Sequence, residues 1–159
     1  MVTASEDPGQ LAWSLIEPHW DVLCASWDRG ADAFAAQMQK VPLKVQHLFP
    51  AHWCESEVCN GGFHQFFHNS TGILAPEAIQ GFAAIGASEL SAIVSEATGF
   101  FGPVYPRERS ARLARLPNAS GRKREEWDPF AALDARFYDW LEAESNRWDR
   151  LADAYAADA

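Results

Sequence analysis

A stretch of polar and aromatic residues that begins at Glu57 contains the side chains best suited by type and spacing to do chemistry. It reads Glu-Val-Cys-Asn-Gly-Gly-Phe-His-Gln-Phe-Phe-His-Asn-Ser-Thr-Gly. His64 and His68 are four residues apart, a spacing at which two imidazoles on one helix can hold a metal. Glu57 would lie about 10 Å from His64 on a straight helix, too far to complete such a site. A third ligand would have to come from elsewhere, with His47 and His52 as candidates, so we expect no native metal and no cofactor.

Catalysis has little support in the same stretch. Glu57, with Asn60 and Gln65 nearby, is the one candidate for a catalytic acid, but such a cluster more often forms a polar network that bridges helices. The sequence contains no Gly-x-Ser-x-Gly, no phosphate-binding loop and no dinucleotide fingerprint. Cys59 is expected on an apolar face, where a thiol is inert. We therefore assign no catalytic residue.

The same stretch has the periodicity of a helix but carries two adjacent glycines. Gly61 and Gly62 together cost a helix about 2 kcal/mol relative to alanine. A kink, a ligand or the close approach of another element would explain glycine at these positions. We predict a helix distorted at the glycine pair and packed closely by another element, with Phe63 and Phe67 buried. At 100° per residue one face carries Glu57, Gly61, His64, Gln65 and His68, and the other Cys59, Phe63, Phe66 and Phe67.

The spacing of these residues resembles a known family signature. The signature residues are Glu57, Asn60, Gly61, Gly62, Phe63, Gln65, Asn69 and Gly72. Their pattern resembles that of a bacterial family of unknown function whose best-known member is a DNA-mimic protein. The resemblance continues through Ala75-Pro76-Glu77-Ala78, Ile85-Gly86-Ala87 and Asp134-x-Arg136-Phe137-Tyr138, and covers about residues 10–155. It implies an all-helical fold, an acidic homodimer and binding to a transcription factor, and it leaves open whether the signature is structural or binds a partner.

Composition indicates one globular domain. The chain has 159 residues, 48% of them hydrophobic, which is enough to bury a core without disulfides or metals. Its three cysteines are an odd number without Cys-x-x-Cys spacing, so reduced thiols in the cytoplasm fit best. We see no signal peptide and no apolar run of membrane-spanning length, and expect no membrane association.

Charge is distributed unevenly along the chain. The net charge is −9, yet residues 102–124 carry seven basic residues and only one acidic residue. An acidic protein of this kind is repelled by nucleic acid at long range, so we expect no direct nucleic-acid binding. The basic segment is either a patch for an anion or acidic partner, or a solvated helix and loop that neutralises acidic helices nearby; we favour the second interpretation.

Hydrophobic periodicity predicts an all-α domain of about seven or eight helices over residues 1–159. Asp7 and Pro8, followed by Gln10, predict the start of the first helix. Pro50 is expected to interrupt a helix. In the last helical region Glu144 falls within the apolar stripe, which predicts either a break near Ser145-Asn146 or a partner for Glu144.

Four acidic residues in that last region, Asp139, Glu142, Asp149 and Asp153, are expected to form an exposed row opposite the apolar stripe. A DNA duplex carries one charge per about 1.7 Å of its axis. The eight acids of this region, on one helix, would give one charge per roughly 5–6 Å. Mimicry of a duplex would therefore need several helices, or a dimer, to lay acidic surfaces side by side.

Three functions remain from the sequence. The first is a non-enzymatic acidic protein that uses this row to bind a basic protein such as a DNA-binding transcription regulator. The second is a small-ligand or enzymatic site on the polar face of the signature, from Glu57 to Asn69. The third is an immunity-type protein that blocks a toxin. High salt would weaken the first sharply and the second little, because only the first depends on exposed charges.

Overall fold

The structure is a computed structural model that describes residues 7–118 and 121–158, and every regular element within them is helical. The predicted all-α class is therefore confirmed. The α-helices are α1 (Gln10–Ile16), α2 (Trp20–Trp27), α3 (Ala31–Met38), α4 (Leu43–His68), α5 (Ala75–Ile85), α6 (Ser88–Thr98), α7 (Arg109–Leu113), α8 (Arg124–Trp127), α9 (Ala131–Glu142) and α10 (Arg147–Ala157), and the 3-10 helices are η1 (Glu17–His19), η2 (Ser70–Leu74) and η3 (Gly99–Phe101).

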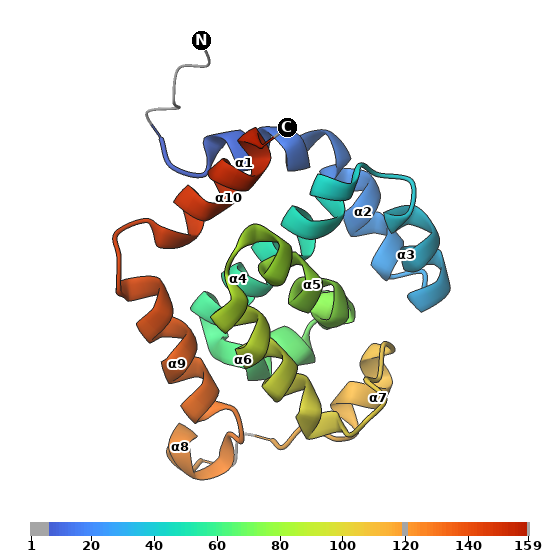
Figure 1. The fold of residues 1–159 in the computed structure, drawn as a ribbon. Helices are drawn as coiled ribbons and strands as arrows, with labels where there is room; N and C mark the ends of the chain where they lie inside the picture. The colour runs from blue at the N-terminus through green and yellow to red at the C-terminus, as the bar shows by residue number, and fades with distance from the viewer. Residues whose placement is uncertain (1–6, 119–120, 159) are drawn as a thin grey trace.

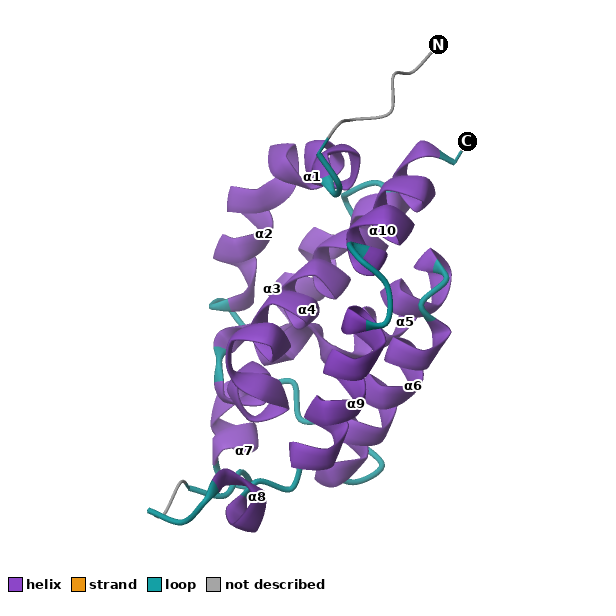
Figure 2. Ribbon diagram, turned by 90° about the vertical axis from the view of Figure 1, so that its left-hand side faces the viewer, coloured by secondary structure: helices purple, strands orange, loops and turns teal. Residues whose placement is uncertain are grey.

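The long helix α4 is the element around which the others pack. Helices α5 and α6 cover one side of it, and α9 and α10 run along another (Figure 1). Helices α1 and α2 lie at one end of the molecule, and α7 and α8 lie at the opposite end (Figure 2). Within the described ranges, none of the helices has the length and apolar character needed to cross a membrane.

Two features of α4 set its packing. Pro50 lies buried inside the helix, which continues through it, so the expected interruption at Pro50 is wrong. The proline forfeits one helical hydrogen bond, while its ring is packed in the core. On the side facing α5, a Cβ atom at Gly81 would collide with the carbonyl oxygen of His47. A glycine at this position therefore lets the two backbones come into contact.

The first helix starts later than predicted. Its N-cap is Gly9, with a φ of 87°, and the main-chain carbonyl of Asp7 accepts from the amide of Gln10. The last helical region is divided into two helices near Ser145 and Asn146, which confirms the predicted break. Helix α9 ends at Glu142 and α10 starts at Arg147, with Asn146 in the left-handed conformation between them.

Candidate functional site

The signature forms a kink in the middle of α4. Gly61 has φ −153° and ψ 18°, and Gly62 has φ 74° and ψ −178°, whereas the residues on both sides are helical. Gly62 thus occupies a region of φ that favours glycine. Phe63 and Phe67 are completely buried. The predicted distortion and the predicted burial of both rings are confirmed.

Helix α9 is the element that packs against the kink. The amide of Phe63 donates a hydrogen bond to Asp134 Oδ1 at 2.8 Å, and the hydroxyl of Tyr138 donates to the carbonyl of Val58 at 2.6 Å. Asp134 and Tyr138 are one helical turn apart, so both side chains face α4. Burial raises the pKa of Asp134 to about 6, while the hydrogen bond from Phe63 opposes this shift. The Asp134-to-Tyr138 part of the resemblance therefore corresponds to residues that stabilise the glycine kink.

Arg124 completes the contacts at the kink. Its guanidinium donates to the carbonyl of Gly61, and its Nε donates to Asp128 Oδ2 at 2.9 Å. Asp128 is buried, and its second oxygen accepts from the amide of Phe130 at the start of α9. One arginine thus links the glycine pair to the N-terminal end of α9.

Glu57 is the centre of a buried polar network. Its carboxylate accepts hydrogen bonds from Gln65 Nε2 at 2.6 Å and from Thr71 Oγ1 at 2.7 Å. Asn69 Nδ2 donates to both carboxylate oxygens, at 3.2 and 3.1 Å. These donors link the first half of α4 to its second half and to η2, across the kink. Of the polar signature side chains, Asn60 is exposed and makes no hydrogen bond within the described residues.

Cys59 lies on the solvent side, so its expected position on the apolar face is wrong. The kink explains the error, because the two non-helical glycines shift the phase of the helix between Val58 and Phe63, both of which are buried. Partial burial of the sulfur, followed by the nearby Glu55 carboxylate, raises the pKa of Cys59 to about 12. The thiol therefore stays protonated at neutral pH, and a protonated thiol is a poor nucleophile.

The basic segment is folded onto main-chain carbonyls. Arg112 is completely buried and donates to the carbonyls of Phe67, Asn69, Pro106 and Arg107. A buried guanidinium needs its N–H groups satisfied, and carbonyl oxygens at the C-terminus of α4 also carry the negative end of the helix dipole. Both interpretations of residues 102–124, as a patch for an anion or acidic partner and as a solvated helix and loop, assume exposed side chains. Neither predicts the burial of Arg112.

Neighbouring arginines repeat the arrangement at the surface. Arg109 donates to the carbonyl of His68, and Arg115 donates to that of Phe101. Arg107 donates to the carbonyl of Ile73 and forms an ion pair with Glu77 at 2.7 Å. The spacing of these arginines in the sequence does not predict that they bind main-chain carbonyls, because every residue of every chain offers such a carbonyl.

His64 and His68 lie side by side, and no third metal ligand lies beside them among the described residues. Their ring centroids are 6.2 Å apart, and His64 Nε2 is hydrogen-bonded to the carbonyl of Pro117 at 2.9 Å. Where the structure describes the chain, no group of three or more His, Cys, Asp or Glu side chains is close enough together to hold a metal. His52 and His47 contact Trp13 and Tyr155 instead. The prediction that the protein carries no metal is open to elemental analysis of untagged protein.

The acidic row predicted in the last helical region is divided between two environments. Asp139 and Glu142, on α9, are exposed as expected. Asp153 is half-buried, and its two oxygens accept from the amides of Gly9 and Ala12 at 2.8 and 2.9 Å, which caps α1. Asp149, also half-buried, packs against Gly9. The expectation of four exposed carboxylates is wrong for α10, because α1 packs on that helix.

Comparison with known proteins gives one match. A family model described as DMP19-like protein matches residues 39–158. The match therefore includes α4 to α10 and begins directly after α3, whereas the resemblance predicted a start near residue 10. No curated protein and no solved structure matches the chain.

Proposed function

The chain belongs to the DMP19-like protein family, and from this premise we propose that it is a non-enzymatic binding protein that imitates DNA and engages a basic, DNA-binding transcription regulator. The resemblance noted from the signature is to a family typified by a DNA mimic, and the net charge of −9 suits a basic partner. The proposal concerns a surface and not a catalytic centre, since Glu57 already accepts hydrogen bonds at both of its oxygens.

The observation that carries the proposal is an acidic surface formed by two helices. Glu89 on α6 and Asp139 and Glu142 on α9 are exposed, and none of them has an ion-pair partner among the described residues. We call these three residues the α6–α9 acidic surface. Helices α6 and α9 pack side by side, so carboxylates from two helices contribute to one surface, the kind of arrangement that mimicry of a duplex would need (Figure 1).

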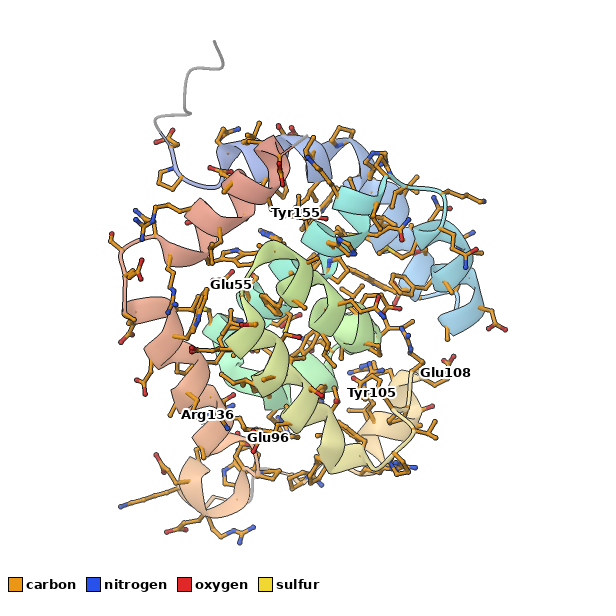
Figure 3. The ribbon with its side chains drawn as sticks, viewed as in Figure 1. Glu55, Glu96, Tyr105, Glu108, Arg136 and Tyr155 are labelled. Atoms are coloured by element: carbon orange, nitrogen blue, oxygen red, sulfur yellow. The ribbon has the colours of Figure 1, made fainter. Side chains whose placement is uncertain are left out.

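Two arginines lie near this surface, and one of them is paired with a carboxylate while the other keeps its charge. Arg136 forms an ion pair with Glu96 at 2.7 Å, and Figure 3 shows the two side chains meeting between α9 and α6. Arg147 stacks over the ring of Trp140 at 4.0 Å and donates to the Trp140 carbonyl. The acidic surface therefore keeps a net negative charge, which would steer a basic partner toward it.

The test is displacement of a captured partner by DNA. The protein is immobilised, exposed to native lysate at low salt and then washed with duplex DNA. A regulator that reads DNA with the same surface is released by the duplex and by high salt, since both compete with charge contacts. A D139K/E142K variant, folded by circular dichroism, should fail to capture it.

The matched control is an E125K/E126K variant. It carries the same change of charge on exposed residues of α8, the short helix that precedes α9 at the end of the molecule opposite α1 (Figure 2). Retention by this control and loss by D139K/E142K support the α6–α9 acidic surface. A partner that both variants retain, and that duplex DNA does not release, contradicts DNA mimicry and favours the immunity-type alternative.

A further inference from the structure

A cavity of about 280 Å³ lies between the start of α1, the first half of α4 and the start of α10. Trp13, His52, Trp148 and Asp149 line it together with Gln10 and smaller apolar residues. Its volume is near the lower limit for ligand cavities, about 300 Å³, so it suits a group the size of one side chain. It is separate from the signature network and from the α6–α9 acidic surface.

Asp149 is the charged side chain among the described residues that line the cavity, and none of the described residues pairs with it. In the described part of the chain its carboxylate accepts no hydrogen bond and forms no ion pair, whereas Asp153, one turn later, uses both of its oxygens to cap α1. Burial, followed by the charge of Asp153, raises the pKa of Asp149. A half-buried carboxylate without a donor is unfavourable, and a bound cation would remove this cost.

The surroundings of Asp149 are negative and aromatic. Glu55, which Figure 3 shows between α4 and α10, has its pKa raised mainly by burial and also by the charge of Asp149. Among the residues that the structure describes, no lysine or arginine lines the cavity. The nearest bases of α10 point elsewhere, because Arg147 stacks on Trp140 and Arg150 pairs with Glu144.

His52, on α4, supplies a neutral polar atom to the lining of the cavity. Its ring lies 5.7 Å from that of Trp13 and makes no hydrogen bond that the structure describes. Burial lowers the pKa of His52, so the imidazole is uncharged at neutral pH and offers one nitrogen as an acceptor. The cavity thus presents acceptors and indole rings but no charged donor.

We propose that this cavity binds an organic cation, an alkylammonium or guanidinium group, with Asp149 as its counter-ion and Trp13 and Trp148 as its aromatic walls. The N–H groups of the cation donate to the Asp149 carboxylate and to the free nitrogen of His52. The cation also lies against electron-rich indole faces, an attraction that grows when water is excluded. The proposal stands independently of the DNA-mimic function, since it uses none of the same residues.

Titration with small probes tests the proposal. The cations are n-butylguanidinium and n-butylammonium, and n-butanol and n-butyrate are the neutral and anionic controls. We expect saturable binding of the cations alone, with shifts of the Trp13 and Trp148 indole resonances and none of Trp140. D149N should weaken binding at least about tenfold and still fold, because Asp149 has no partner to lose.

The matched control is D32N, which removes a similar carboxylate from the exposed face of α3 and should leave cation binding unchanged. A blocked Gly-Arg-Gly peptide distinguishes the two sources of the cation. Binding of the peptide as tight as that of n-butylguanidinium indicates a side chain of a protein partner, and binding of the free cations alone indicates a small metabolite. Equal binding of n-butanol, unchanged binding in D149N, or no saturation by about 10 mM cation overturns the proposal.

Discussion

Gly62 lies against Asp134 so closely that no side chain fits between them. A Cβ atom at Gly62 would be 2.9 Å from Asp134 Cγ and closer still to Oδ2, while Oδ1 of the same carboxylate accepts from the amide of Phe63. The Asp134 carboxylate thus occupies the space that a side chain at Gly62 would need, and it accepts the hydrogen bond of the next amide, that of Phe63. This contact couples the kink in α4 to α9.

A comparison of two alanine substitutions measures this close approach. Gly62 and Gly102 share one backbone conformation, with φ of 74° and 91° and ψ of −178° and −169°, but a Cβ atom at Gly102 would meet nothing within 4 Å. G102A should cost about 1–3 kcal/mol of unfolding free energy from backbone strain alone. G62A adds a steric clash and should cost at least about 1–3 kcal/mol more than G102A. Urea denaturation of both variants measures the difference, and equal losses would refute the steric argument.

Asp134 should make stability depend on pH in an unusual direction. Its pKa is raised to about 6, so the folded state takes up a proton at a higher pH than the unfolded state. The stability of the parent relative to D134N should therefore rise as the pH falls from 7.5 through 6 toward 4, by on the order of 1–3 kcal/mol. The asparagine keeps an acceptor for the Phe63 amide and does not titrate. If the stability of the parent relative to D134N instead decreases as the pH is lowered, burial is not the main influence on the pKa of Asp134.

Arg112 should be among the most costly residues to truncate. It is completely buried, and its removal leaves carbonyls of Phe67, Asn69 and Arg107 without their donor. R112A should lose about 3–5 kcal/mol of unfolding free energy. Arg115 is the control, because it is exposed and donates to a single carbonyl, so R115A should cost under about 1 kcal/mol. Similar losses in the two variants would contradict the role assigned to burial.

Asp153 should stabilise the protein through the first helix. D153A removes the acceptor of the Gly9 and Ala12 amides and should cost about 1–2 kcal/mol, as the loss of a helix cap does. Amide hydrogen exchange in α1 should accelerate more than exchange in α5. E142A, which removes an exposed carboxylate of α9, should change neither measurement. Slow exchange retained in α1 of D153A would mean that the cap is dispensable.

The glycine pair shows how far the sequence leads and where it stops. Two adjacent glycines in a helical pattern predict a distortion and a close neighbour, and both exist at Gly61 and Gly62. The sequence does not reveal the phase change that the kink introduces, so a uniform helical projection puts Cys59 on the wrong face. The identity of the neighbour, Asp134, depends on the tertiary path of α9, and only the resemblance singled out that segment.

Charged residues were harder to predict because their partners are main-chain groups. Asp153 has the spacing of an exposed row, yet it caps a helix far away in the sequence. Arg112 lies in a segment that looks solvated, yet it is completely buried on carbonyl oxygens. Helix periodicity assigns a face to each side chain, but it contains no information on which faces another helix will cover.

The tryptophans near the N-terminus give the protein an intrinsic optical probe. Trp20 and Trp53 are stacked with ring centroids 4.9 Å apart, and Trp13 lies 5.1 Å from Trp20. Indole transitions at such separations couple to one another, and the coupled bands in circular dichroism depend on the fixed orientation of the rings. Since Trp13 and Trp20 precede the family-matched residues and Trp53 lies within them, this spectral signal reports the docking of the first helices onto the family domain.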